Sequence, residues 1–213
     1  MYKLKDMITN PTTELTEETK ETLNLLYELA EGKAESFETK ITNNLRTARN
    51  LTVPITVILK SHQEIRVITS DTTDNDITEA IQETLNHIIS GGTDNIINGI
   101  TRLIHTDLHT VLDDTKGKER TETRYYIATE GLSIVRLDFM YWSRHINATN
   151  TDNYVKKCLM YTVVKSSVDL SKLSFNAFLS EYQKQLSKCS FNIDELKQEI
   201  QHIQEIYKLF NPF

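Results

Sequence analysis

The stretch VPITVILKSHQEIRVITSDTTDNDITEAIQETLNHIISGG, residues 53–92, decides the fold because its apolar period changes partway along it. Residues 53–59 and 64–69 are rich in β-branched residues and flank a short polar segment, which indicates two paired strands. From Ile77 onward, isoleucine and leucine recur every three or four positions, which indicates a helix. We therefore expect a strand pair over residues 53–69 and a domain in which helices cover a sheet.

Helical patterns lie on both sides of these strands. Residues 14–49 carry an apolar stripe at helical spacing that Gly32 interrupts, which predicts a helical pair. Residues 77–114 carry a second stripe, interrupted at the glycine pair 91–92, which predicts another helical pair with Thr93 as the cap of its later half.

Residues 123–164 contain three further strand patterns. Two of them flank Glu130 and Gly131, a dipeptide that favours a β-hairpin. The third, residues 158–164, is apolar on both faces, which predicts a central strand covered on each side. The three patterns occupy residues 123–129, 132–139 and 158–164.

Residues 174–210 predict two C-terminal helices, the first of them capped by Ser174. A chain of 213 residues fits one domain, so residues 1–213 are expected to form a single unit. The fold class that we predict is α/β (α+β). It is a helix–sheet–helix sandwich with two helical pairs around a central, mainly antiparallel sheet, followed by the C-terminal helices.

The composition is that of a globular protein, with 25% charged residues and a net charge of −6. No segment has the roughly 18 uncharged apolar residues of a membrane span, and the first residues lack the apolar core of a signal peptide. We therefore expect a soluble protein that is cytoplasmic as made, with export or membrane association left open. An acidic chain without a recognition motif argues against a nucleic-acid partner.

The charges are unevenly distributed along the chain. Residues 64–114 hold ten acidic and two basic side chains, whereas residues 116–172 hold ten basic and six acidic ones. Such a cluster usually marks a solvated face. The alternative is a contact with anionic membrane lipid, for which the candidate residues are Lys116, Lys118, Arg120 and Arg124.

No catalytic motif stands out in the sequence. It contains no G-x-S-x-G, H-E-x-x-H or glycine-rich phosphate loop. His105 and His109 lie four residues apart with Asp107 between them, but both fall away from the apolar stripe of their helix and no third ligand is apparent. We therefore expect no metal site, no cofactor and no enzymatic activity, with an enzyme of unrecognised site as an alternative.

Cys158 begins the most apolar strand pattern, and Lys156 and Lys157 precede it. A cysteine in such a position normally packs as a small hydrophobic residue. The alternative is that the lysines favour the thiolate and that Cys158 carries a thioester-linked fatty acid. Cys189, in a polar segment, is the better candidate if acylation serves a surface anchor.

The last helix carries a heptad-like seam. This seam either packs against the rest of the same chain or binds a protein partner or a second copy. The residues proposed for interaction are Leu196, Ile200, Ile203, Tyr207 and Phe210.

The order of elements is similar to that of a known family. The residues that carry the similarity are ITVILKSHQEIRVITSDTTDNDITEAIQETLNHIISGG, the helix that continues to Asp114, TRYYIATE, and CLMYTVVKSSVDLSKLSFNAFLSEY, within residues 15–182. This arrangement resembles the cytolytic δ-endotoxin (Cyt) fold, which volvatoxin and the palmitoylated Erwinia virulence factor share.

The resemblance implies a lipid-interacting sandwich with a toxin or virulence role in a bacterium or its host, and Cys158 as the closest counterpart of an acylated cysteine. The helices here are more polar than the family's, which favours a membrane-associated factor over a pore former. The function that we expect is therefore a non-enzymatic, membrane-interacting virulence or toxin-like protein, with a thioester-linked fatty acid left open. The alternative is a protein-interaction module that uses its last helix.

Overall fold

The computed structural model describes residues 1–9, 16–47, 51–90, 94–112, 119–146, 155–186 and 193–210. In this part of the chain, five strands form one antiparallel sheet in the order β1-β2-β5-β4-β3. The strands are β1 (Tyr2–Lys3), β2 (Ile55–Thr69), β3 (Glu119–Glu130), β4 (Ser133–His145) and β5 (Val155–Val168).

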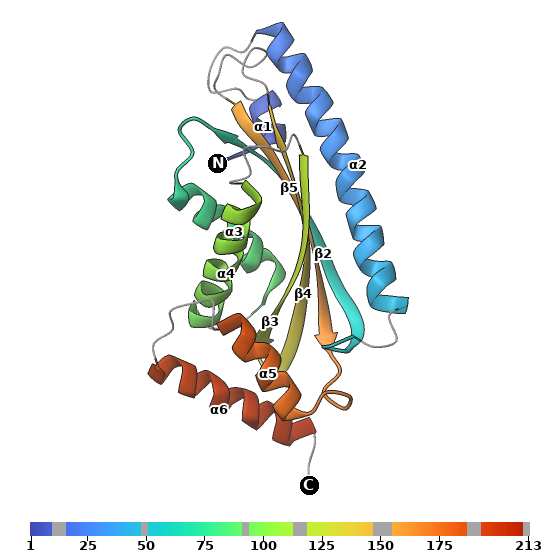
Figure 1. Ribbon diagram of the computed structural model, residues 1–213, viewed down its shortest axis with the longest axis vertical. Coiled ribbons are helices and arrows are strands. Elements are labelled where there is room, and N and C mark those ends of the chain that lie inside the picture. Colours follow the sequence, from blue (N-terminus) through green and yellow to red (C-terminus); the bar gives the residue numbers. More distant parts are fainter. Residues whose placement is uncertain are drawn as a thin grey trace.

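Helices cover both faces of the sheet. The helices of the described ranges are α1 (Leu4–Thr9), α2 (Glu17–Thr47), α3 (Asp74–Ile88), α4 (Asp94–Leu112), α5 (Phe175–Leu186) and α6 (Ile193–Phe210). Figure 1 shows α2 along one face of the sheet, α3 and α4 along the other, and α5 and α6 near the end where β3 turns into β4. The predicted mixed α/β sandwich with an antiparallel sheet and C-terminal helices is therefore confirmed.

The central strand β5 shows how the two faces are built. Leu159, Tyr161 and Val163 lie in the hydrophobic cluster with α3 and α4, whereas Cys158 and Met160 lie in the cluster with α2. Successive side chains of a strand point to opposite faces, so a strand between two helical layers carries apolar residues on both faces. β5 lies between β2 and β4, which confirms the prediction of a covered central strand.

The predicted helical pair over residues 14–49 is wrong, because α2 is one continuous helix of 31 residues. Gly32 lies on its exposed side, where a glycine costs about 1 kcal/mol relative to alanine. Each large apolar side chain that the helix buries contributes roughly 1.5–3 kcal/mol, which outweighs that cost. The buried stripe passes Gly32 without interruption: Leu23, Leu26, Ala30, Ala34, Phe37, Ile41 and Leu45.

The predicted strand pair over residues 53–69 is also wrong, because β2 is a single strand of 15 residues. The polar segment 60–63 does not turn; it pairs with β5, with Ser61 opposite Val164 and His62 opposite Val163. This segment contains no glycine or proline to form a turn, and the irregularity appears instead as a register shift between Ile58 and Lys60.

Apart from β1 and α1, which were not predicted, the remaining elements agree with the sequence. The helical pair over residues 77–114 appears as α3 and α4, although the glycine pair 91–92 and the Thr93 cap lie outside the described residues. Gly131 has a φ of 59°, the left-handed conformation that a tight hairpin requires. The Oγ of Ser174 accepts a hydrogen bond from the backbone N–H of Ala177, as expected of a helix cap.

Candidate functional site

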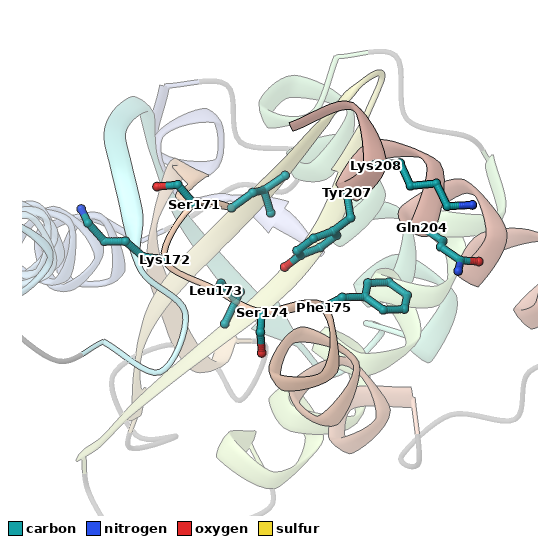
Figure 2. Close-up of a pocket in the computed structure, with 9 residues that line it drawn as sticks. Ser171, Lys172, Leu173, Ser174, Phe175, Gln204, Tyr207 and Lys208 are labelled. Atoms are coloured by element: carbon teal, nitrogen blue, oxygen red, sulfur yellow. The ribbon is translucent and has the colours of Figure 1, made fainter. Parts of the chain in front are cut away.

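A pocket of about 540 Å³ opens where the segment after β5 meets the C-terminal half of α6. Leu173, Phe175 and Tyr207 supply its apolar wall, and Lys172 and Lys208 stand at its rim. Figure 2 shows the Tyr207 ring reaching from α6 toward Leu173, while the two lysine side chains extend outward on opposite sides.

The segment that forms one wall of the pocket is held by Asp169. Its Oδ1 accepts hydrogen bonds from the Ser171 hydroxyl (2.6 Å) and the Ser171 backbone N–H (3.2 Å). Its backbone N–H donates to the carbonyl of Pro54 at 2.8 Å, which ties the segment to the start of β2. The chain then enters α5 at Phe175, so the pocket lies beside backbone N–H groups that have no partner within the helix.

Tyr207 is the unusual side chain of this pocket. The residue is 6% exposed, and its ring packs edge-on against Phe175 at 5.2 Å between centroids. Its hydroxyl is buried without a hydrogen-bond partner among the described residues. Burial raises the pKa of Tyr207 above the ordinary value, so the hydroxyl stays neutral. A buried unpartnered hydroxyl costs about 1–3 kcal/mol, so this side chain lowers the stability of the fold unless its hydroxyl gains a partner.

The end of α6 beside the pocket exposes apolar side chains. Leu209 is 62% exposed and Phe210 58%, directly after the exposed Lys208. Two large apolar residues next to a cation at a helix end are typical of a surface that meets lipid or a partner. Glu205, also exposed, lies one helical turn before them and limits the basic character of this end.

The seam of the last helix mostly serves the chain's own core. Ile203 is completely buried and Tyr207 nearly so, in a cluster with α5 and the ends of the strands, which confirms the packing interpretation for these two residues. Ile200 is half-buried, and the side chain of Leu196 lies outside the described residues. Of the described interaction residues, Phe210 is exposed, whereas Ile203 and Tyr207 are not available to a partner helix. Partner binding through the rest of the seam stays a prediction.

The arginines proposed to contact a membrane are engaged with other groups. Arg120 donates to the Thr110 carbonyl at 2.6 Å and to Glu122 at 3.0 Å. Arg124 contacts Glu122 at 3.0 Å and Asp107 at 3.8 Å. Lys116 and Lys118 lie outside the described residues. The two described arginines, Arg120 and Arg124, are therefore paired with carboxylates and do not form a basic patch that is open to lipid.

Cys158 lies in the core, with no exposed surface. Burial raises its pKa to about 12, so the expectation that neighbouring lysines favour the thiolate is wrong. Lys157 instead donates to the backbone carbonyl of Leu112, and Lys156 is exposed. Acylation of Cys158 stays a prediction, and Cys189 lies outside the described residues.

A second cleft, of about 380 Å³, lies between β2 and α3 beside a charged network that the sequence did not reveal. Arg66 contacts Glu64 at 3.2 Å and Glu83 at 2.5 Å, and Lys3 contacts Glu83 at 2.9 Å. These contacts lower the pKa of Glu83 to about 2, first through the hydrogen bond from Lys3 and then through that from Arg66. Two cations and two carboxylates balance one another, so this network ties β1, β2 and α3 together without an additional ligand.

The two histidines of α4 are only partly buried, which agrees with their predicted position off the apolar stripe. The expectation that no third ligand is close to them is wrong, because Asp74 of α3 lies beside them. Asp74 precedes His105 by 31 positions and belongs to another helix, so a helical wheel of α4 alone cannot show that the two residues are close.

In comparisons with known proteins, no family model, no curated protein and no solved structure matches the chain. Within the described ranges, no helix is both long enough and apolar enough to cross a membrane.

Proposed function

We propose that this protein is a non-catalytic binding protein that attaches reversibly to anionic lipid surfaces. The contact is the C-terminal end of α6 together with the pocket beside it. The observation that carries the proposal is the exposure of Leu209 and Phe210 directly after Lys208, next to a pocket whose buried hydroxyl has no partner.

The expected binding strength follows from these side chains. Burying a leucine and a phenylalanine at a lipid interface contributes roughly 1.5–3 kcal/mol each. A lysine near an anionic leaflet adds about 1 kcal/mol. Such a contact supports weak peripheral binding and does not insert a helix, which agrees with a membrane-associated factor rather than a pore former.

Lipid suits this surface better than a partner helix. The lysines at the pocket rim extend outward, where headgroup phosphates would lie (Figure 2). The exposed apolar pair, Leu209 and Phe210, is at the helix end rather than along one face. The Tyr207 hydroxyl and the N-terminal backbone of α5 are donors for a phosphate oxygen that enters the pocket. A toxin or virulence role rests on the family resemblance alone.

Co-sedimentation with phosphatidylglycerol vesicles at low salt tests the proposal, with phosphatidylcholine vesicles for comparison. We expect Phe210→Glu and Leu209→Glu to lose most of the binding. Leu25→Glu is the matched control, because Leu25 on α2 is also 62% exposed and is remote in sequence from the pocket. The proposal fails if the unmodified protein does not bind anionic vesicles, or if Leu25→Glu loses as much binding as Phe210→Glu.

A protein partner at the same surface is the competing outcome. Light scattering on the unmodified protein and on Phe210→Glu distinguishes it, since a dimer formed through Phe210 would dissociate in the variant without any lipid. Soluble glycerophosphate added to the vesicle assay tests what the pocket recognises. If it competes with the vesicles, the pocket recognises phosphate itself. If vesicle binding is unchanged, the exposed apolar residues supply most of the affinity.

A further inference from the structure

The antiparallel packing of α3 against α4 brings three ligand-type side chains together. Asp74 lies in the first turn of α3, and His105 and His109 lie on successive turns near the end of α4. One ligand atom from each residue lies within 4.8 Å of the others. None of the three belongs to the surface proposed to bind lipid.

The spacing of these atoms matches the coordination shell of a small metal ion. The Nε2 atoms of His105 and His109 are 3.2 Å apart, and the Nε2 of His109 is 3.5 Å from the Oδ1 of Asp74. Two ligands that bind Zn²⁺ tetrahedrally, each about 2.0–2.1 Å from the ion, are themselves separated by about 3.3 Å. These two spacings fit one ion without movement. The third spacing, between His105 and Asp74, is at most 4.8 Å, so the exposed Asp74 carboxylate would move toward His105 when an ion binds.

The arrangement of the rings supports the same conclusion. The two imidazoles meet nearly edge to face, with centroids 4.4 Å apart, and it is their Nε2 atoms that converge. Histidines four residues apart on a helix present both rings on one side, which is the spacing of helical zinc ligands. The side chains of Asp74 and His109 remain 77% and 35% exposed, so an ion can reach the site from solvent.

We propose that Asp74, His105 and His109 form a binding site for a divalent transition-metal ion of the zinc class. Two imidazoles and one carboxylate suit Zn²⁺ and Co²⁺ better than Ca²⁺ or Mg²⁺, which prefer oxygen ligands. Three protein ligands leave at least one coordination position for water. Because the ligands come from two helices, the ion would also fasten the start of α3 to the end of α4.

Calorimetric titration of the metal-free protein with Zn²⁺ alone tests the site. We expect one ion per chain with a dissociation constant in the micromolar range or below. His105→Ala and His109→Ala should each weaken binding by at least tenfold, and Asp74→Asn by several-fold. His62→Ala is the matched control, because His62 belongs to another close histidine pair, with its ring centroid 4.8 Å from that of His87. The His62→Ala protein should bind Zn²⁺ as tightly as the unmodified protein does.

Titration with Co²⁺ gives an independent readout, since a four-coordinate site produces intense visible absorption that hexaaqua Co²⁺ lacks. Circular dichroism without metal should show that all four variants are folded, because their side chains lie at the surface or in a cleft. If Zn²⁺ does not bind at one ion per chain, or if Asp74→Asn and His105→Ala bind it as the unmodified protein does, the proposal is overturned and the 3.5 Å contact is only an ion pair between helices.

Discussion

The guanidinium of Arg66 on β2 contacts the carboxylate of Glu83 on α3 at 2.5 Å, and this contact fastens a helix to an outer part of the sheet. Arg66 is 5% exposed, whereas the side chain of Glu83 is 56% exposed. The buried cation thus reaches a carboxylate at the surface, with Glu64 as its second partner. An arginine in such a position needs both carboxylates, because an uncompensated buried charge is strongly destabilising.

This contact predicts a specific dependence of stability on pH. The pKa of Glu83 is lowered from 4.5 to about 2, so its ion pairs stabilise the folded state above about pH 5 and this contribution is lost as the pH falls toward 2. Glu83→Gln should lower the free energy of unfolding by about 0.5–1 kcal/mol at pH 7, a value that allows for solvent screening. Urea denaturation at a series of pH values should show this difference in unfolding free energy constant above about pH 5 and narrowing as the pH falls from 5 toward 2.

Glu79→Gln, on an exposed position of the same helix, is the control and should differ little from the unmodified protein at any pH. A Glu83→Gln variant whose deficit stays constant down to pH 3 would contradict the ion-pair explanation.

Two glycines should respond to alanine in opposite directions. A Cβ atom added at Gly32 or at Gly131 would meet nothing within 4 Å, so packing does not distinguish them. Gly32 lies within α2, where alanine should raise the free energy of unfolding by about 0.5–1 kcal/mol. Gly131 has a φ of 59°, where alanine should lower it by about 1 kcal/mol. Thermal or urea unfolding measures the stability change of each variant. Changes of the same sign in the two variants would contradict either the left-handed hairpin residue at 131 or the continuous helix through residue 32.

The two glycines also show how far the sequence could predict the fold. Gly131 follows Glu130 between two strand patterns, and local rules correctly placed a hairpin there. Gly32 gave the same local signal of a break, but α2 continues because its stripe packs against Val67, Met140 and Trp142 of the sheet. That packing partner is distant in the sequence, so no local pattern could show that it would override the glycine.

The candidate sites were less predictable for the same reason. Tyr207 was recognised as part of a seam, yet only the position of residues 170–175 reveals the pocket that its ring enters. Asp74 precedes the apolar stripe of its helix and has no distinguishing neighbour in sequence. It becomes a candidate ligand only when α3 and α4 pack antiparallel. Local patterns in the sequence thus predicted where the helices and strands lie. Which side chains these elements bring together could be learned only from the structure.

Cys158 should be chemically inert in the folded protein. With a pKa of about 12, only about one thiol in 10⁵ is ionised at pH 7, and no part of the residue is exposed. In a Cys189→Ser variant, a thiol reagent such as dithionitrobenzoate should react with nothing within minutes, and should react with one thiol after unfolding in guanidinium chloride. Fast reaction of the native variant would contradict this expectation. A hydroxylamine-sensitive fatty-acyl mass on Cys158, with no thiol reacting even after unfolding, would instead support the acylation prediction.

Tyr207→Phe separates stability from binding at the proposed lipid contact. The variant removes a buried hydroxyl that has no partner, so the free energy of unfolding should stay unchanged or rise by up to about 1 kcal/mol. If that hydroxyl donates to a headgroup oxygen, affinity for phosphatidylglycerol vesicles should fall by about three- to tenfold. Tyr125→Phe is the matched control, because the Tyr125 hydroxyl donates to Glu181 at 2.8 Å in the same part of the molecule.

Tyr125→Phe should therefore lose about 1 kcal/mol of stability and bind vesicles normally. Urea unfolding and vesicle co-sedimentation should be measured on both variants. If the Tyr207 hydroxyl donates to a ligand, Tyr207→Phe loses vesicle binding but not stability, whereas Tyr125→Phe loses stability but not vesicle binding. The reverse pattern, a destabilised Tyr207→Phe that binds vesicles as well as the unmodified protein, would mean that the hydroxyl has an internal role and that the pocket does not recognise lipid through it.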